Sequence, residues 1–199
     1  YARGMDYHLV CRSFLMPICD YIRELGLGDF SKCISCDTGP YHERELARQA
    51  GLGFIGKNGC LIHKRYGSYC FIGVIACQGL DLEPDAPEED HCMECGNCIK
   101  ACPGKALGEE SFCLERCLSH ISQKRGELSK EEQALLERSP LIWGCDFCQS
   151  VCPYNQGVPL TPLAQFRENL IDSIEEEEIK NLSNREFLKK YKGRSFTWR

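Results

Sequence analysis

The feature that most constrains this 199-residue chain is the spacing of its cysteines, of which it has 16. In the middle of the chain they follow the order Cys-x2-Cys-x2-Cys-x3-Cys-Pro, from Cys92 to Pro103. This is the spacing that holds a four-iron, four-sulfur cluster. Three close thiolates take three corners of a cubane, and the fourth reaches a neighbouring cluster. The spacing therefore predicts two adjacent 4Fe-4S clusters.

The end of the same pattern recurs farther along as Cys145-x2-Cys148-x3-Cys152-Pro153. The run Ile142-Trp-Gly-Cys has no thiol three residues ahead of Cys145, so one ligand must come from elsewhere. Cys113 and Cys117 lie between the two motifs, and either can supply it. Because the last thiolate of each run crosses to the other cluster, the first cluster is assigned Cys92, Cys95, Cys98 and Cys152, and the second Cys102, Cys145, Cys148 and one intervening cysteine.

Structural zinc and disulfides are the alternatives for these cysteines. Two Cys-x2-Cys pairs can hold a tetrahedral zinc ion, but zinc does not require the x2-x2-x3-Pro spacing. Neighbouring cysteines in such turns are poorly placed to form disulfides with one another. A Cys33-x2-Cys36 redox pair is an alternative for two of the remaining thiols. Otherwise those thiols are predicted to be buried small apolar side chains, namely Cys11, Cys19, Cys33, Cys36, Cys60, Cys70, Cys77 and Cys113.

Composition and charge indicate where the protein resides and which classes of partner it binds. The chain has 24 lysines and arginines against 29 aspartates and glutamates, a formal charge of -5, so its overall charge does not indicate a nucleic-acid partner. Its 43% apolar content suits a globular protein. The sequence has neither an apolar run long enough to cross a membrane nor a signal-peptide profile at its start. We therefore predict a soluble, cytoplasmic protein with no membrane partner.

Apolar periodicity and turn residues divide the first 82 residues into helical and extended segments. Apolar residues at three- and four-residue steps predict an amphipathic helix that is closed by Gly26. The turn Thr38-Gly39-Pro40 links an extended segment to a second helix. The predicted order is helix 6–25, extended segment 33–37, helix 41–50, glycine-rich loop 51–59, and strands 60–63 and 68–77.

The whole sequence predicts an α+β protein in three parts. A partial α/β domain covers residues 1–82, and an acidic, proline-containing linker follows it. A ferredoxin-like double 4Fe-4S domain covers residues 91–156, with a helix near 130–138. A polar, mostly helical tail covers residues 157–199.

Four blocks in this order resemble the epoxyqueuosine reductase family, and the resemblance spans nearly the whole chain. The blocks are Tyr1-Ala-Arg-Gly-x-Asp-Tyr-His8, Asp37-Thr-Gly-Pro40 with Glu43, Ala50-Gly-Leu-Gly-Phe-Ile-Gly-Lys-Asn58, and the double cluster motif that ends Trp143-Gly-Cys-Asp-Phe-Cys-Gln-Ser-Val-Cys-Pro-Tyr-Asn155.

The resemblance implies a cobalamin-dependent enzyme that reduces the epoxide of epoxyqueuosine in a tRNA anticodon loop. Electrons from an external donor would pass through the two clusters, and residues 1–82 would be part of the cobalamin-binding domain. In the family a segment similar to Arg116-Cys117-Leu118-Ser119 supplies the distant cluster ligand, which favours Cys117 over Cys113. The first portion of the family's catalytic domain is absent here, so we expect an upstream segment to be missing and the cobalamin cavity to be incomplete.

The resemblance also assigns site residues. Asp37 falls at the family's position for the acid that protonates the substrate, whereas composition alone favours a turn or cap residue there. For the residues before the first helix the alternative is helix capping, and for the glycine loop it is a plain turn. The predicted cobalamin and substrate contacts are Arg3, Asp6, Tyr7, His8, Gly53, Gly56, Lys57 and Asn58.

Two other functions compete with this prediction. A reductive dehalogenase uses the same cofactors, and a tyrosine-lined apolar pocket or an export signal would favour it. A non-catalytic ferredoxin-type electron-transfer protein would bind no corrin. A cavity shared by Asp37 and the loop at residues 51–58, facing the clusters, separates an enzyme from such a carrier.

Overall fold

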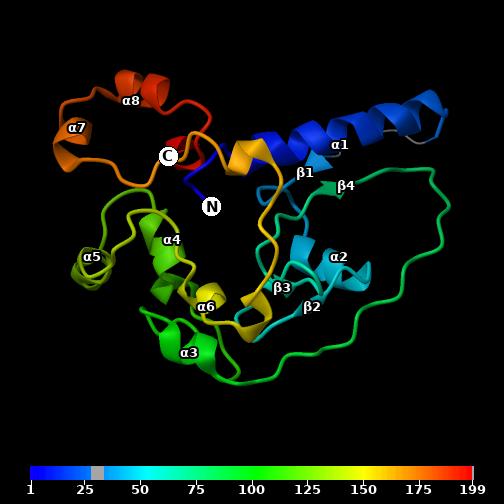
Figure 1. Cartoon of the computed structure of the whole chain (residues 1–199), viewed down its shortest axis with the longest axis horizontal. Coiled ribbons are helices and arrows are strands. Elements are labelled where there is room, and N and C mark those ends of the chain that lie inside the picture. The colour runs from blue at the N-terminus through cyan, green and yellow to red at the C-terminus, as the bar shows by residue number, and fades with distance from the viewer. Residues whose placement is uncertain (28–33, 199) are drawn as a thin grey trace.

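The computed structural model describes residues 1–27 and 34–198, and it combines short helices with two small antiparallel sheets (Figure 1). Cys33, predicted to open the extended segment, lies outside the described residues. The α-helices are α1 (Tyr7–Glu24), α2 (Glu43–Gln49), α3 (Asn97–Ala101), α4 (Leu118–Ser122), α5 (Lys130–Glu137), α6 (Phe147–Ser150), α7 (Glu176–Lys180) and α8 (Asn184–Lys190). The 3-10 helices are η1 (Leu114–Arg116), η2 (Pro153–Asn155), η3 (Ala164–Phe166) and η4 (Ser195–Trp198).

Helix α1 confirms the predicted first helix to within a residue at each end. Asp6 caps its N-terminus, where the Asp6 carboxylate accepts a hydrogen bond from the backbone N–H of His8 at 3.0 Å. The turn after the helix contains Gly26 at φ +69°, a left-handed conformation that glycine adopts without strain. Tyr7, Val10 and Cys19 form its buried face.

The two sheets have two strands each. Strand β1 (Ile34–Ser35) pairs with β4 (Val74–Ile75), and β2 (Phe54–Ile55) pairs with β3 (Leu61–Ile62). The glycine-rich segment therefore contains a strand, although its sequence predicts only a loop.

The predicted strand 68–77 was too long, because only Val74–Ile75 pairs. At the start of this segment the backbone N–H of Ser68 donates to the side chain of Asn155 at 2.7 Å instead of to a neighbouring strand. A side-chain partner thus replaces the ladder that would have extended the strand.

Short helices separate the cysteines in the middle of the chain. Helix α3 packs against α6, and α4 packs against α5, which begins at a capping box made by Ser129 and Glu132. The predicted helix near residues 130–138 is confirmed by α5. Leu118 and Ile121 on α4 form a local core.

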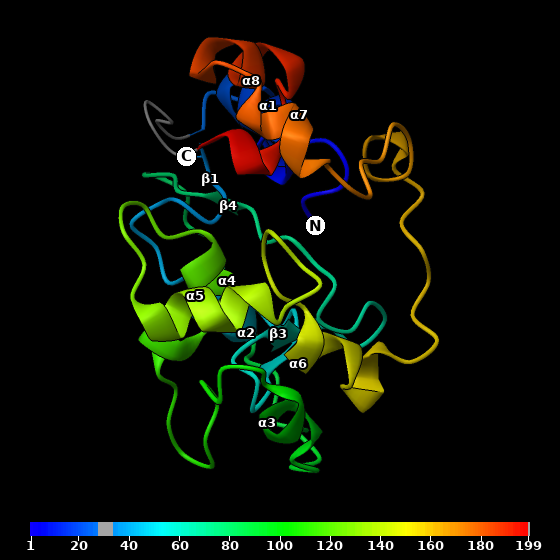
Figure 2. The same cartoon turned by 90° about the vertical axis from the view of Figure 1, so that its left-hand side faces the viewer.

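The C-terminal tail folds back beside the start of α1. The backbone N–H of Asp6 donates to the carbonyl of Gly193 at 2.8 Å, and Figure 2 shows α7 and α8 at the same end of the molecule as α1. Phe187, Tyr191 and Phe196 contact one another through their rings. Within residues 1–27 and 34–198, none of the helices has both the length and the apolar character that a bilayer crossing demands.

Candidate functional site

A cavity of about 750 Å³ lies beside Asp37. It is bounded by the N-terminus, the start of α1, the segment between β1 and α2, and residues of α4 and the segment after it. The rings of Tyr7 and Phe71 stack with centroids 4.4 Å apart and planes 3° apart. Tyr1 and Tyr41 add further aromatic surface. The cavity therefore has aromatic side chains beside a carboxylate.

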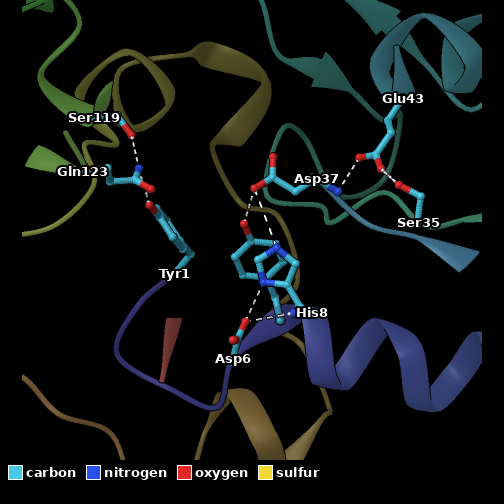
Figure 3. A network of polar contacts seen from close by, with 9 residues as sticks. Tyr1, Asp6, His8, Ser35, Asp37, Glu43, Ser119 and Gln123 are labelled. Atoms are coloured by element: carbon cyan, nitrogen blue, oxygen red, sulfur yellow. Dashed lines mark hydrogen bonds and ion pairs between the residues drawn. The ribbon is translucent and has the colours of Figure 1, made fainter. Parts of the chain in front are cut away.

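Asp37 follows β1 in a left-handed conformation, with φ at +64°. Glu43 on α2 holds this turn: one of its carboxylate oxygens accepts from the backbone N–H of Asp37 at 2.7 Å, and the other accepts from the hydroxyl of Ser35 at 2.7 Å (Figure 3). The Asp37 side chain is 65% exposed. The turn is therefore fixed from behind while the carboxylate stays accessible to a ligand.

Residues at the start of α1 contact the Asp37 carboxylate. The Tyr7 hydroxyl donates to Asp37 Oδ2 at 2.5 Å, and His8 Nε2 lies 3.9 Å from the same oxygen (Figure 3). On its other side, His8 Nδ1 is 2.8 Å from Oδ1 of Asp6, which is 1% exposed. Burial, and then the bond to Asp37, raises the pKa of Tyr7 far above its usual range. Tyr7 therefore keeps its proton and acts as a donor.

Tyr1 joins this cavity to the cysteine region. Its hydroxyl accepts from Gln123 Nε2 at 2.9 Å, and the same amide nitrogen lies 3.2 Å from Ser119 Oγ. Burial raises the pKa of Tyr1 to about 12. Ser119 follows the predicted ligand Cys117 by two residues. The wall of the cavity is thus tied to the predicted second cluster.

The four cysteines assigned to the first cluster line one small cavity, although Cys152 is far from the others in sequence. Glu94 and Gly96 both have positive φ, which curls the backbone between the first three cysteines. Burial raises the pKa of Cys152, and charge on nearby Cys95 and Cys92 adds to the shift. The four thiols line one cavity without being grouped to hold a metal ion, so their assignment to a cubane rests on the cysteine spacing.

The cysteines assigned to the second cluster come from separate segments. Burial raises the pKa of Cys145 to about 11, and charge on Cys148 and Cys117 adds to that shift. Cys113 instead points its thiol at Glu115, 3.5 Å away. Cys102 Sγ accepts from the backbone N–H of Ala106 at 3.2 Å. In the part of the chain that the structure describes, no three His, Cys, Asp or Glu side chains are grouped to hold a metal ion.

The remaining predicted contacts are divided between the cavities. Tyr7 lines the Asp37 cavity, and Asp6 and His8 support it from the helix cap. Arg3 does not line it and forms an ion pair with Asp172.

The glycine loop faces two ways. Lys57 and Asn58 line the cavity of the first cysteine set, whereas Ile55 and Gly59 line the Asp37 cavity. Gly53 and Gly56 line neither. A Cβ on Gly53 would collide with the carbonyl oxygen of Ile62, and one on Gly56 would lie 2.5 Å from the Ile62 side chain. These two glycines serve the β2–β3 pairing.

Sequence reasoning did not assign several residues of the cavity a role. Phe71, Ser119 and Gln123 lie far apart in sequence from Asp37, and their local sequence gives no sign of a shared site. Tyr1 belongs to the sequence block at residues 1–8, but the sequence predicted no cofactor or substrate contact for it.

Residues 91–155 match the family described as a 4Fe-4S double cluster binding domain, which defines the class as an iron-sulfur protein. The chain is 37% identical to the epoxyqueuosine reductase of Lactococcus garvieae, over 98% of this chain and 55% of that protein. The chain is therefore homologous to epoxyqueuosine reductases along nearly its whole length. It spans about half the length of the curated relatives it matches.

Solved structures agree with this assignment. The epoxyqueuosine reductase of Streptococcus thermophilus superposes with a TM-score of 0.81 at 33% identity, covering 98% of this chain and 51% of that one. An epoxyqueuosine reductase solved with an epoxyqueuosine-modified tRNA-Tyr stem loop superposes with a TM-score of 0.78 at 32% identity, covering 99% of this chain and 52% of that one.

Proposed function

We propose that this protein reduces epoxyqueuosine to queuosine in the anticodon loop of tRNA. The observation that carries the proposal is the Asp37 carboxylate, hydrogen-bonded by Tyr7 and exposed to a cavity whose wall continues into the double cluster region. Homology to epoxyqueuosine reductases along 98% of the chain supports the substrate, as does the related structure that holds the modified stem loop.

Asp37 is the proton donor in this proposal. Removing an epoxide oxygen as water consumes protons, and a group within hydrogen-bond reach must supply them. Asp37 projects into the cavity, Tyr7 holds a proton against its Oδ2, and His8 stands between Asp37 and Asp6. Tyr7 and His8 therefore orient the Asp37 carboxyl group through Oδ2, and the carboxyl group itself gives the proton to the substrate.

The cysteines hold the two clusters that accept electrons from an external donor. Their shared cavity supports Cys92, Cys95, Cys98 and Cys152 as the ligands of the first. The proximity of Cys145, Cys148 and Cys117 supports a second cluster completed by Cys102. Clusters tied by crossed ligands lie close enough for stepwise electron transfer.

Residues 1–82 contribute one side of a cobalamin site in this proposal. When bound, cobalamin supplies a low-valent cobalt able to open or deoxygenate an epoxide. Phe71 is 40% exposed and stacks on the buried ring of Tyr7, so it offers aromatic surface to a macrocycle, and 750 Å³ lies within the range of small-molecule sites. Gly59 and Ile55 of the glycine-rich segment also line this cavity.

Anaerobically reconstituted protein tests the proposal in two stages. We expect about eight irons per chain, a change in the visible spectrum of added cobalamin, and conversion of an epoxyqueuosine-bearing stem loop when a low-potential reductant is supplied. Eight irons without corrin binding or turnover would indicate a non-catalytic electron carrier and would reject the proposed enzymatic activity.

One observation favours a second candidate, a reductive dehalogenase. Three tyrosines line the cavity, Tyr1, Tyr7 and Tyr41, and a tyrosine-lined pocket is what that activity predicts. The same loaded protein incubated with a halogenated aromatic compound distinguishes the two. Halide release without conversion of the stem loop would favour the dehalogenase.

A further inference from the structure

A network of hydrogen bonds joins the second cysteine motif to the segment that leads into the Asp37 cavity. The side chain of Asn155, three residues after Cys152, is bonded to Ser68, although the two residues are 87 positions apart in sequence. Phe71 follows Ser68 by three residues and lines the Asp37 cavity. The Asn155 amide therefore links the segment of a predicted cluster ligand to the wall of the cavity.

Both polar atoms of the Asn155 side chain have partners. Oδ1 accepts from the backbone N–H of Ser68 at 2.7 Å, and Nδ2 donates to Ser68 Oγ at 2.8 Å and to the carbonyl of Gln149 at 2.7 Å. Ser68 is 7% exposed, and its hydroxyl in turn donates to Gln149 Oε1 at 2.9 Å. The position needs one acceptor and two donated protons, which an amide provides and a carboxylate does not.

A glycine allows the two segments to approach this closely. Gly67 has φ +59°, and a Cβ there would lie 2.0 Å from Asn155 Oδ1 and 2.7 Å from the carbonyl oxygen of Tyr154. The backbone of Gly67 also pairs with that of His63 through two hydrogen bonds, at 2.8 and 2.9 Å. Ser68 is therefore presented to Asn155 from a turn that is itself held on both sides.

The same network holds the backbone of the second cysteine motif. The backbone N–H of Asn155 donates to the carbonyl of Cys152 at 3.0 Å, in addition to the bond from its side chain to the carbonyl of Gln149. Gln149 Nε2 donates to Asp146 Oδ1 at 2.6 Å, and Asp146 directly follows Cys145. The network therefore runs beside the motif from its first cysteine to its end.

We propose that Asn155 is a positioning residue that fixes the second cysteine motif against the segment carrying Phe71, and so sets the separation between the clusters and a substrate in the Asp37 cavity. Electron transfer slows as that separation grows, and a displacement of about 1 Å can slow a reaction by about 10²-fold. The inference rests on the proposed function and on the proposed ligand role of Cys152.

Two substitutions remove different parts of the network, and a third is the control. Asn155→Ala removes the whole amide. Ser68→Ala removes only the hydroxyl and leaves the backbone N–H of residue 68 bonded to Asn155. Asn181→Ala is the matched control, because Asn181 Nδ2 donates to the carbonyl of Glu177 at 2.8 Å within the C-terminal tail. Each protein is reconstituted anaerobically with iron and cobalamin, and its iron is counted.

Hydrogen exchange and single-turnover kinetics provide the readouts. We expect Asn155→Ala to exchange backbone amide protons faster over residues 63–72 and also over residues 145–156. Its saturating single-turnover rate on the modified stem loop should fall by about 10- to 100-fold, with the half-saturating stem-loop concentration unchanged. Ser68→Ala should show smaller changes in the same direction, and Asn181→Ala should match the wild type.

Two results would overturn the proposal. One is a wild-type rate in iron-loaded Asn155→Ala. The other is faster exchange over residues 145–156 alone, because Asn155 would then stabilise only its own turn. If Asn155→Ala does not hold iron, Ser68→Ala decides: a lower rate with faster exchange in both segments supports the proposal, and wild-type behaviour overturns it.

The exchange measurement keeps this inference separate from the proposed reaction, because it needs no stem loop. A wild-type protein that does not convert the stem loop would reject the proposed function, and the exchange rates would still show whether Asn155 couples the two segments. Exchange that is unchanged over residues 63–72 overturns the inference whether or not the stem loop is converted.

Discussion

The Asp37 cavity and the cysteine region are held together in different ways. Around Asp37, the Tyr7 hydroxyl donates to the carboxylate and the backbone N–H of Asp37 donates to Glu43, so both are fixed before any ligand binds. In the cysteine region, thiols such as Cys92, Cys95 and Cys152 converge, and each would repel the others once deprotonated. Iron offsets that repulsion, since metal binding contributes directly to folding in such sites. The first site is preorganised, whereas under the proposed ligand assignment the second is completed by its metal.

Removing a crossed ligand should have the largest effect and tests the metal-dependent side of this contrast. We expect Cys152→Ala to lose about half of its iron, because Cys92, Cys95 and Cys98 leave one corner of the cubane without a thiolate. Iron and sulfide analysis measures the loss. Cys113→Ala is the control and should keep all of its iron, since its thiol contacts Glu115. Equal iron loss in the two variants would reject the crossed assignment.

Replacing the carboxylate tests the preorganised side. Asp37→Asn keeps the shape of the side chain but removes the acid, so we expect turnover of the modified stem loop to fall by about 10² to 10⁴-fold. The iron content and both cluster potentials should remain those of the wild-type protein. Single-turnover rates on iron-loaded protein provide the measurement. Wild-type rates would show that the proton comes from another group.

Removing the partner of the carboxylate should have a smaller effect. Tyr7→Phe deletes the 2.5 Å hydrogen bond to Asp37 and leaves the ring stacked on Phe71. A hydrogen bond to a charged group contributes roughly 1.5 to 3 kcal/mol, so we expect a decrease in turnover of about 10- to 100-fold. The pH profile of the rate should change as well, which a purely structural role would not produce. A Tyr7→Phe profile identical to the wild type would contradict this role.

The smallest effect should come from the contact that joins the two regions. Gly144 has φ +72°, and a Cβ there would lie 2.6 Å from the Tyr1 ring. Gly157 has φ +71° with no described atom within 4 Å of such a Cβ.

Each alanine variant incurs left-handed strain of about 1 to 2 kcal/mol. We expect Gly144→Ala to lower the free energy of unfolding more than Gly157→Ala does, in denaturant titrations of iron-loaded protein. Equal losses would show that Tyr1 moves aside without cost.

The parts of the molecule that depend on short-range sequence were predicted well. The periodicity of residues 6–25 predicted α1, and the cysteine spacing predicted a double cluster domain that the family match confirms. Both follow from neighbours within a few residues, so a local pattern contains the information. The ligand assignments and the cobalamin contacts stay predictions.

The parts that depend on distant contacts were not predictable. Phe71, Ser119 and Gln123 reach the Asp37 cavity only through the tertiary fold. The glycine loop shows the same limit at closer range. Its strand β2 and the turn that follows direct Ile55 toward one cavity and Lys57 toward the other, and no glycine spacing encodes that division.

The cavity that Cys92 shares with Cys152 has a consequence for biosynthesis. On a ribosome the chain emerges from its N-terminus, so the first three thiols are exposed well before the fourth one exists. Under the proposed ligand assignment, the first cluster can reach its complete ligand set only after Cys152 has left the exit tunnel. Iron delivered earlier would meet only three of the four thiols. Iron delivered when the polypeptide is nearly complete would meet all four, so the crossed ligand favours cluster insertion after translation.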